Sequence, residues 1–171
     1  FPYTTLFRSS NIFQPYIIQE LFRNEKSVLS AELGLGIKNS TFEADNARIS
    51  HDKLTVLSPA LSYKHYDKSG QWFARNEVGI GLDILGANAA SDITSSRLKS
   101  GSQFFRDTVT LARIQKLAWG TYGIFRFTGQ YSPSSLVSLE QMQLGGASTV
   151  RGYREGRLIG DSGFVLSAEW H

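Results

Sequence analysis

Residues 28–38 read Val-Leu-Ser-Ala-Glu-Leu-Gly-Leu-Gly-Ile-Lys, and their side chains alternate strictly in character. The apolar set is Leu29, Ala31, Leu33, Leu35 and Ile37, and the intervening set is Ser30, Glu32, Gly34, Gly36 and Lys38. Because successive side chains of a β-strand point to opposite faces, this period of two predicts a strand with one apolar and one polar face. Strands of soluble proteins usually have about five or six residues, so this run is long.

The same alternation recurs along the chain. It is clear at residues 54–66, 72–85, 121–131 and 163–170, and two further segments, 15–23 and 104–118, are expected to be strands in which a β-bulge shifts the phase. We therefore predict an all-β fold of about seven antiparallel strands without a helix. The connections alternate between short ones, at 24–26, 67–70 and 119–120, and long ones, at 42–53, 87–103 and 132–159.

Strand length and charge favour a membrane barrel. A tilted strand that crosses a bilayer needs about 9 to 11 residues, and outer-membrane barrels pair short periplasmic turns with long extracellular loops. Charged residues in the middle of the polar faces are then expected to line a water-filled pore; they are Glu32, Lys38, Arg75, Glu77, Asp83 and Arg126. A soluble sheet protein, whose strands also place charges outward, remains the alternative.

Composition excludes several other classes. The formal net charge is +3 and the basic residues are scattered, which argues against a nucleic-acid partner. The chain has no cysteine, and its three histidines, at positions 51, 65 and 171, share no ligand spacing, so we expect neither a metal nor a cofactor. Mean hydropathy is −0.20 and no long apolar run occurs, which excludes a transmembrane helix but not a barrel, whose alternating strands average out.

The ends of the sequence do not look natural. Residues 1–9, Phe-Pro-Tyr-Thr-Thr-Leu-Phe-Arg-Ser, can be back-translated into a common short-read sequencing adapter, so we interpret them as an adapter scar. The chain begins without Met, and its last alternating run stops at Trp170 and His171. We therefore expect residues 10–171 to be a fragment of a transmembrane β-barrel domain.

The longest connection, 132–159, carries the most distinctive residues. It contains Leu144-Gly-Gly-Ala-Ser-Thr-Val-Arg-Gly-Tyr153, and Gly160-Asp-Ser-Gly163 leads into the final strand. These pieces resemble the sixth extracellular loop and the following strand of two-partner secretion transporters, the haemolysin activator or filamentous haemagglutinin transporter family of the outer-membrane assembly superfamily. The resemblance is strongest over residues 119–170.

The resemblance implies a sixteen-stranded barrel in the outer membrane of a Gram-negative bacterium, of which this chain would supply about seven strands. The barrel would follow periplasmic POTRA domains, absent here, and would pass an unfolded exoprotein, haemolysin or haemagglutinin-like, to the cell surface without enzymatic chemistry. The loop would fold into the lumen with its tip at Val150, Arg151, Gly152 and Tyr153. Arg151 would pair with an acidic residue of the inner wall, in the strand that follows the last one here, and a bidentate guanidinium contact suits that task.

Further roles follow from the same resemblance. Gly160, Asp161 and Gly163 mark the start of the final strand, and Gly34, Gly36, Gly79 and Gly81 leave room on the inner wall for the folded loop; backbone packing in twisted strands is an equally good explanation of these glycines.

Three other functions are compatible with parts of the sequence. An assembly insertase of the same superfamily shares the Val-Arg-Gly-Tyr motif. A soluble secreted β-sheet binding module would bury the apolar face around Leu33, Leu35, Val78 and Ile80 against a second sheet. A serine protease is suggested only by Gly-Asp-Ser-Gly, and neither His51 nor His65 lies in a suitable context.

Overall fold

The computed structural model describes residues 6–44, 47–87, 97, 100–146, 149–150, 152–154 and 156–171. Its strands are β1 (Leu6–Phe13), β2 (Tyr16–Arg23), β3 (Ser27–Ala44), β4 (Ala47–Asp67), β5 (Gly70–Leu82), β6 (Phe105–Lys116), β7 (Tyr122–Tyr131), β8 (Met142–Leu144), β9 (Leu158–Gly160) and β10 (Gly163–Trp170). One 3-10 turn, Ala118–Gly120, links β6 to β7. The predicted all-β class is confirmed.

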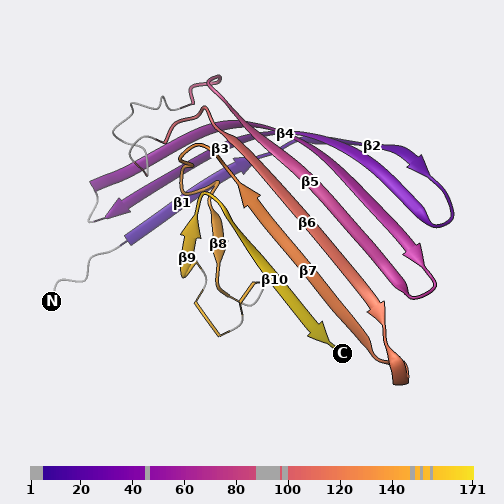
Figure 1. Cartoon of the computed structure of the whole chain (residues 1–171). Helices are drawn as coiled ribbons and strands as arrows, with labels where there is room; N and C mark the ends of the chain where they lie inside the picture. Colours follow the sequence, from indigo (N-terminus) through magenta and orange to yellow (C-terminus); the bar gives the residue numbers. More distant parts are fainter. Residues whose placement is uncertain are drawn as a thin grey trace.

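One large antiparallel sheet contains eight of these strands, in the order β1-β3-β4-β5-β6-β7-β10, with β2 also paired to β3 (Figure 1). β1 pairs with the end of β3 and β2 with its beginning, and the Leu35 amide donates to the Pro15 carbonyl at 3.0 Å between them. The two are therefore successive halves of a single edge, interrupted at Gln14 and Pro15. This gives seven strand positions, as the alternation predicted.

The two expected bulges have different outcomes. The register of β2 shifts between Glu20 and Phe22, so the bulge predicted in residues 15–23 is present. β6 pairs with both neighbours without a shift, so the bulge predicted in residues 104–118 is wrong. Its phase only looked slipped because two polar residues, Asp107 and Arg113, lie on the same face as Val109 and Leu111. Each has a polar partner near it: Asn76 donates to Asp107 at 2.6 Å, and Arg113 donates to Asp67 at 2.6 Å.

A second correction concerns the connection expected at 42–53. β3 extends to Ala44 and β4 begins at Ala47, so most of this stretch is a long hairpin. Hydrophobic alternation indicates a strand only where one face is apolar. The sequence between Asn39 and Lys53 is polar at most positions, so the strands continue there without their usual pattern. The run expected at 72–85 also ends earlier, at Leu82, which leaves Asp83 one residue beyond β5.

The pairing register separates two faces. Glu32, Ala60, Glu77, Thr108 and Gln130 lie opposite one another on successive strands and define what we call the polar face. The other side, the apolar face, carries side chains such as Leu33 and Leu166, which are 51% and 69% exposed. Within the described residues no second sheet covers that face, and the two-stranded sheet β8–β9 packs at the polar one. The soluble binding module, which needs the apolar face buried, is therefore not supported.

The described part of the chain contains no helix of the length and apolarity needed to span a membrane.

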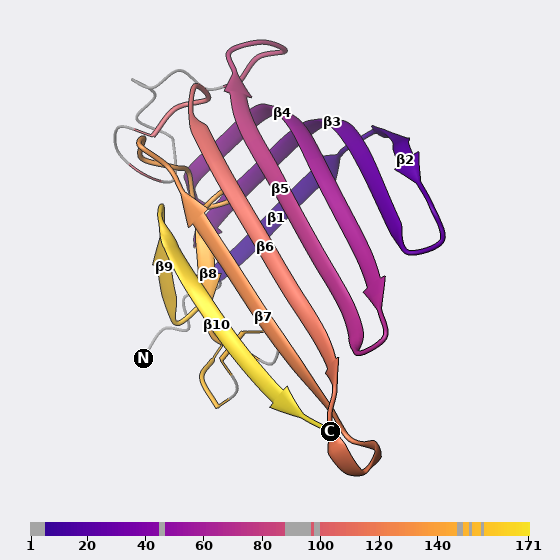
Figure 2. The same cartoon turned by 45° about the vertical axis from the view of Figure 1, so that its right-hand side comes forward.

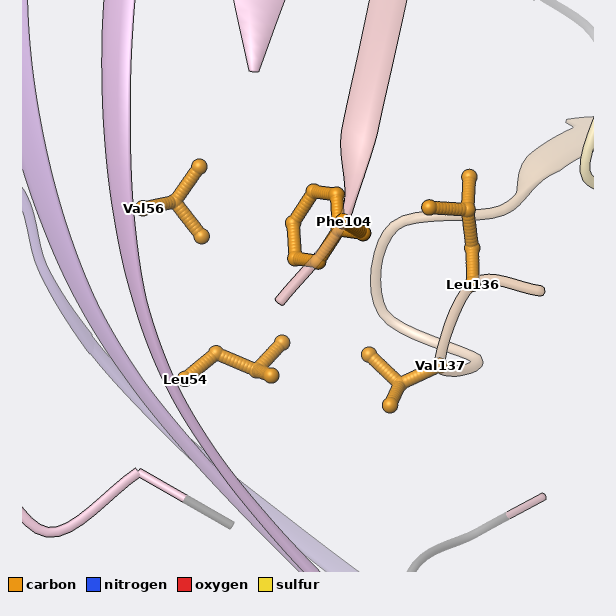
Figure 3. Packing of buried hydrophobic residues seen from close by; sticks show 5 residues of the cluster. All are labelled: Leu54, Val56, Phe104, Leu136 and Val137. Carbon is orange, nitrogen blue, oxygen red and sulfur yellow. The ribbon is translucent and has the colours of Figure 1, made fainter. Parts of the chain in front are cut away.

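The chain that leaves β7 returns along the sheet. Both views show the β8–β9 hairpin pointing toward the end at which the C-terminus lies, instead of extending beyond the strands (Figure 2). Among the described residues, a hydrophobic core forms where the segment between β7 and β8 meets β4. Leu54 and Val56 of β4, Phe104, Leu136 and Val137 are buried together, and their side chains point toward one another (Figure 3).

Candidate functional site

Residues 132–141, which we call the inner segment, are held on the polar face by apolar packing. Leu136 is 0% exposed, Val137 is also buried, and both pack against Leu54 and Val56 of β4 and against Phe104. Leu54 and Val56 are two apolar side chains on the polar face, between Asp52 and Ser58 of the same strand. The inner segment covers them and thereby removes an apolar patch from water.

A buried carboxylate fixes the end of the inner segment. The side chain of Glu140 is 0% exposed, and its two oxygens accept from Lys38 Nζ of β3 at 2.6 Å and from Arg106 Nη1 of β6 at 2.8 Å. The side-chain Nε2 of Gln130, on β7, donates to the backbone carbonyl of Glu140 at 3.0 Å. Three strands of the sheet thus bind one residue of the loop.

The ion pairs continue along the polar face. Arg106 Nη2 contacts Glu77 at 2.9 Å, Glu77 contacts Arg75 at 3.0 Å, and Arg75 makes a bidentate pair with Glu32 at 2.9 and 3.1 Å. Arg75 reaches Glu32 across β4, where the side chains between them are small, Ala60 and Ser62. Four of the predicted pore residues, Glu32, Lys38, Arg75 and Glu77, therefore belong to one network of alternating charge. The other two, Asp83 and Arg126, are exposed and have no ion pair with a described residue.

Gly81 makes room for chain that crosses the polar face, and Gly79 makes room for the side chain of its paired residue Arg106. A Cβ at Gly81 would lie 1.9 Å from the Ser102 carbonyl oxygen and 2.5 Å from the Phe104 ring, which no side chain could tolerate. A Cβ at Gly79 would lie 3.1 Å from Arg106 Nε. Gly34 and Gly36 instead neighbour Gln14. The space at Gly79 and Gly81 thus serves residues 102–106, on which the inner segment rests, and not the loop tip.

Asp161 ties both ends of the loop together. Its carboxylate accepts from Arg97 Nη1 at 2.5 and 2.7 Å, from Gln141 Nε2 at 2.9 Å and from the Leu136 amide at 3.1 Å. Burial by itself would raise the pKa of Asp161, but the hydrogen bonds from Arg97, Gln141 and the Leu136 amide, with the charge of Arg97, outweigh it and hold that pKa below its ordinary value. The aspartate of the Gly-Asp-Ser-Gly motif is therefore a structural cross-link of the loop base.

The other residues of that motif are also structural. The Ser162 hydroxyl accepts from the Ser132 amide at 2.9 Å, and Gly160 and Gly163 lie at the end of β9 and the start of β10. His51 and His65 bond to Thr41 and Ser27. A protease would need a histidine beside the serine. The described residues do not assemble that arrangement, and they contain no cluster that could bind a metal ion.

The predicted loop tip is described in part. The Tyr153 amide donates to the Val150 carbonyl at 3.4 Å, and Gly152 has a φ of 92°, a conformation that favours glycine in a tight turn. Val150 is 38% and Tyr153 62% exposed. Arg151, for which we expect the locking contact, lies outside the described residues.

Sequence reasoning missed four residues that organise this site: Arg97, Arg106, Gln130 and Glu140. Arg106 and Gln130 could have been found from the parity of β6 and β7, because both lie on the face that carries Thr108. Arg97 and Glu140 lie in connections, where no periodicity indicates which way a side chain points.

Comparisons with known proteins bear on the family and on the fold. The family model described as haemolysin secretion/activation protein ShlB/FhaC/HecB matches residues 16–170. Hemolysin transporter protein ShlB of Serratia marcescens is 29% identical over 141 residues, covering 81% of this chain and 25% of that protein. The solved structure of CdiB from Escherichia coli has a TM-score of 0.85 and 24% identity, covering 95% of this chain and 30% of CdiB.

The chain thus spans 25% of the length of ShlB and 30% of that of CdiB. The likeness to CdiB confirms the fold, an antiparallel sheet that forms part of a barrel. The resemblance drawn from residues 144–153 and 160–163 is confirmed by a match that covers nearly the whole sequence. This chain belongs to the haemolysin secretion/activation protein family, ShlB/FhaC/HecB.

Proposed function

We propose that this chain is part of an outer-membrane channel of a Gram-negative bacterium, which translocates an unfolded partner exoprotein, haemolysin or haemagglutinin-like, to the cell surface. The channel performs no chemistry on its cargo. The observation that carries the proposal is the inner segment with its β8–β9 hairpin, folded back along the polar face in a chain of this family. POTRA domains of the same protein would deliver the cargo from the periplasm.

The two faces of the sheet support this assignment. An exposed apolar face suits contact with lipid, whose bilayer supplies the apolar surroundings that water does not. The polar face would line the lumen, with Glu32, Lys38, Arg75, Glu77 and Arg126 on strands and Asp83 beside the end of β5. A hydrated lumen with charges of both signs can pass an extended chain without binding any one sequence tightly.

Arg151 at the loop tip is proposed to lock the loop against the barrel wall. The test uses the complete transporter with its partner exoprotein, and measures exoprotein in the medium. We expect Arg151→Ala to lower export strongly while the barrel still inserts, as judged by its heat-modifiable migration. Arg157→Ala, the same change at an exposed arginine of the same loop, is the matched control. Normal export by Arg151→Ala would contradict the assigned role.

The insertase of the same superfamily makes a different prediction. Deleting the gene would then lower the amounts of many outer-membrane proteins, whereas loss of a transporter should affect its partner exoprotein alone. The Gly-Asp-Ser-Gly start of β10, whose aspartate binds Leu136 and Gln141 near the start of the loop, favours the transporter.

A further inference from the structure

Glu140 has the most completely buried charged side chain among the described residues. A carboxylate away from water is costly unless cations neutralise it and donors satisfy its oxygens. Here both conditions are met, one oxygen by Lys38 and the other by Arg106. Such an arrangement fixes the position of Glu140, because displacement would leave its carboxylate and the Lys38 ammonium without their partners.

The two cations come from separate places on the wall. Lys38 is on β3 and Arg106 on β6, with β4 and β5 between them in the sheet. Glu140 therefore bridges across four neighbouring strands. Its own backbone carbonyl is bound by Gln130 of β7, and its amide closes a turn onto the Val137 carbonyl at 2.9 Å. The turn places the ion pairs beside the apolar packing of Val137.

We propose that Glu140 is a positioning residue: it anchors the inner segment in the lumen, as a second attachment of the folded-back loop that acts independently of the tip at Arg151. The inference rests on the proposed function, because it assigns to Glu140 the control of how open the channel is. With the anchor in place, residues 132–141 occupy the lumen beside β4. When the anchor is released, that space becomes available to water, ions and cargo.

The positions of the ion-paired residues distinguish this anchoring role from a general role in stabilising the sheet. Glu32, Arg75, Glu77 and Arg106 all lie on strands of the sheet and connect the wall to itself. Glu140 is the member of the network that comes from the loop. Its loss leaves the Arg106 to Glu77 pair available, so the wall keeps its own links while the inner segment loses both of its ionic contacts.

The experiment compares two variants of the full-length transporter in planar lipid bilayers, each checked for folding by heat-modifiable migration. Glu140→Gln keeps the size of the side chain and removes the charge, and Glu32→Gln makes the same change at the other end of the network. We expect Glu140→Gln to raise the fraction of time in the open conductance state by about tenfold or more, because Lys38 loses its carboxylate partner and Arg106 keeps only its pair with Glu77. Glu32→Gln should change it by less than about twofold, because pairs with this much exposure contribute little.

A third variant keeps the proposal testable if Glu140→Gln does not fold. Lys38→Met removes one of the two cations from the wall and should open the channel in the same direction. Where both single variants fold, adding Lys38→Met to Glu140→Gln should increase opening by less than the product of the separate effects, since both act on one contact.

Two results would overturn the anchor: folded Glu140→Gln channels that are as closed as the wild type, or equal opening by Glu32→Gln. Conductance is recorded without exoprotein, so it is separate from export. Opening by Glu140→Gln in a protein that exports nothing would refute the transport function and retain the anchor. If the protein exports its partner but Glu140→Gln leaves the conductance unchanged, the anchor is refuted and the transport function is retained.

Discussion

Leu136→Ala should release the inner segment from the polar face. Leu136 is 0% exposed and packs with Leu54, Val56, Phe104 and Val137. Truncating a fully buried leucine to alanine costs about 2 to 5 kcal/mol, the sum of lost transfer free energy and the cavity left behind. The cost falls on docking, because Leu136 belongs to the loop while its partners on β4 remain with the sheet. At about 1.4 kcal/mol per factor of ten, the ratio of docked to undocked segment should fall at least about 30-fold.

The assay measures how often the segment leaves the wall. Residues 1–171 contain no cysteine, and in a full-length protein without cysteine elsewhere Val137→Cys, at a buried position beside the substitution, reports undocking through its rate of modification by a soluble maleimide. When redocking is faster than modification, this rate is proportional to the undocked fraction. The rate in the Val137→Cys protein is compared with that in Val137→Cys combined with Leu136→Ala, both in the full-length protein. We expect an increase of about 30-fold or more.

Leu33→Ala in the same reporter background is the matched control, because it removes the same atoms from the apolar face, where Leu33 is 51% exposed. It should leave the modification rate of the reporter thiol close to that in the Val137→Cys protein alone. The reasoning is refuted if Leu136→Ala folds and does not accelerate modification, since the apolar cluster would then contribute nothing to docking. It is equally refuted if Leu33→Ala accelerates modification as much.

Other substitutions test the remaining contacts. Gly81→Val should lower the unfolding temperature of the barrel, followed by heat-modifiable migration, because its Cβ overlaps the Ser102 carbonyl, while Gly34→Ala, whose Cβ meets its nearest atom at 3.6 Å, should not. Asp161→Asn should weaken docking at pH 7. In the wild type, folding lowers the pKa of Asp161, so docking is strongest above the ordinary carboxyl pKa and is lost as the pH falls through the lowered pKa. Maleimide modification of the wild-type background should therefore accelerate at acidic pH, and the Asp161→Asn variant should not show this acceleration. Arg113→Met should speed hydrogen exchange in the β4–β5 turn, because the Arg113 contacts to Asp67, at 2.6 and 3.2 Å, are removed; unchanged exchange would contradict their structural role.

The faces of the sheet could be predicted from sequence because alternation is a local signal. Leu33 and Glu32 differ by one residue and lie on opposite faces, and every strand with a strict period was found. The alternation disappears where neither face of a strand is apolar. Beyond about Asn39 both faces of the β3–β4 hairpin are polar, so strands continue where a loop was expected. In β6, Arg113 interrupts the pattern because its charge is neutralised by a partner, Asp67, that only the fold brings close.

The sequence motifs predicted the family of the protein, but they did not predict the contacts that the site residues make. The residues of 144–153 and 160–163 indicated the family, yet the structural use of Asp161 depends on the Leu136 amide and on Gln141, 25 and 20 residues away. The Glu140 contact to Lys38 joins residues 102 positions apart. Pairings at such separation are fixed by topology, and a charged residue in a loop gives no indication of which strand it will reach.

The composition of β4 explains why the loop folds back at this place. Most of its polar-face side chains are small or polar, which lets Arg75 reach Glu32 across it, but Leu54 and Val56 are not. Two adjacent aliphatic side chains left exposed to water on this face would each lose the benefit of burial, about 1.5 to 3 kcal/mol for a fully buried side chain. Leu136 and Val137 restore it, and Glu140, placed one turn later, finds its cations beside the same patch. Apolar packing therefore selects the position along β4, and the ion pairs fix the orientation, so that neither contact alone would hold the segment in register.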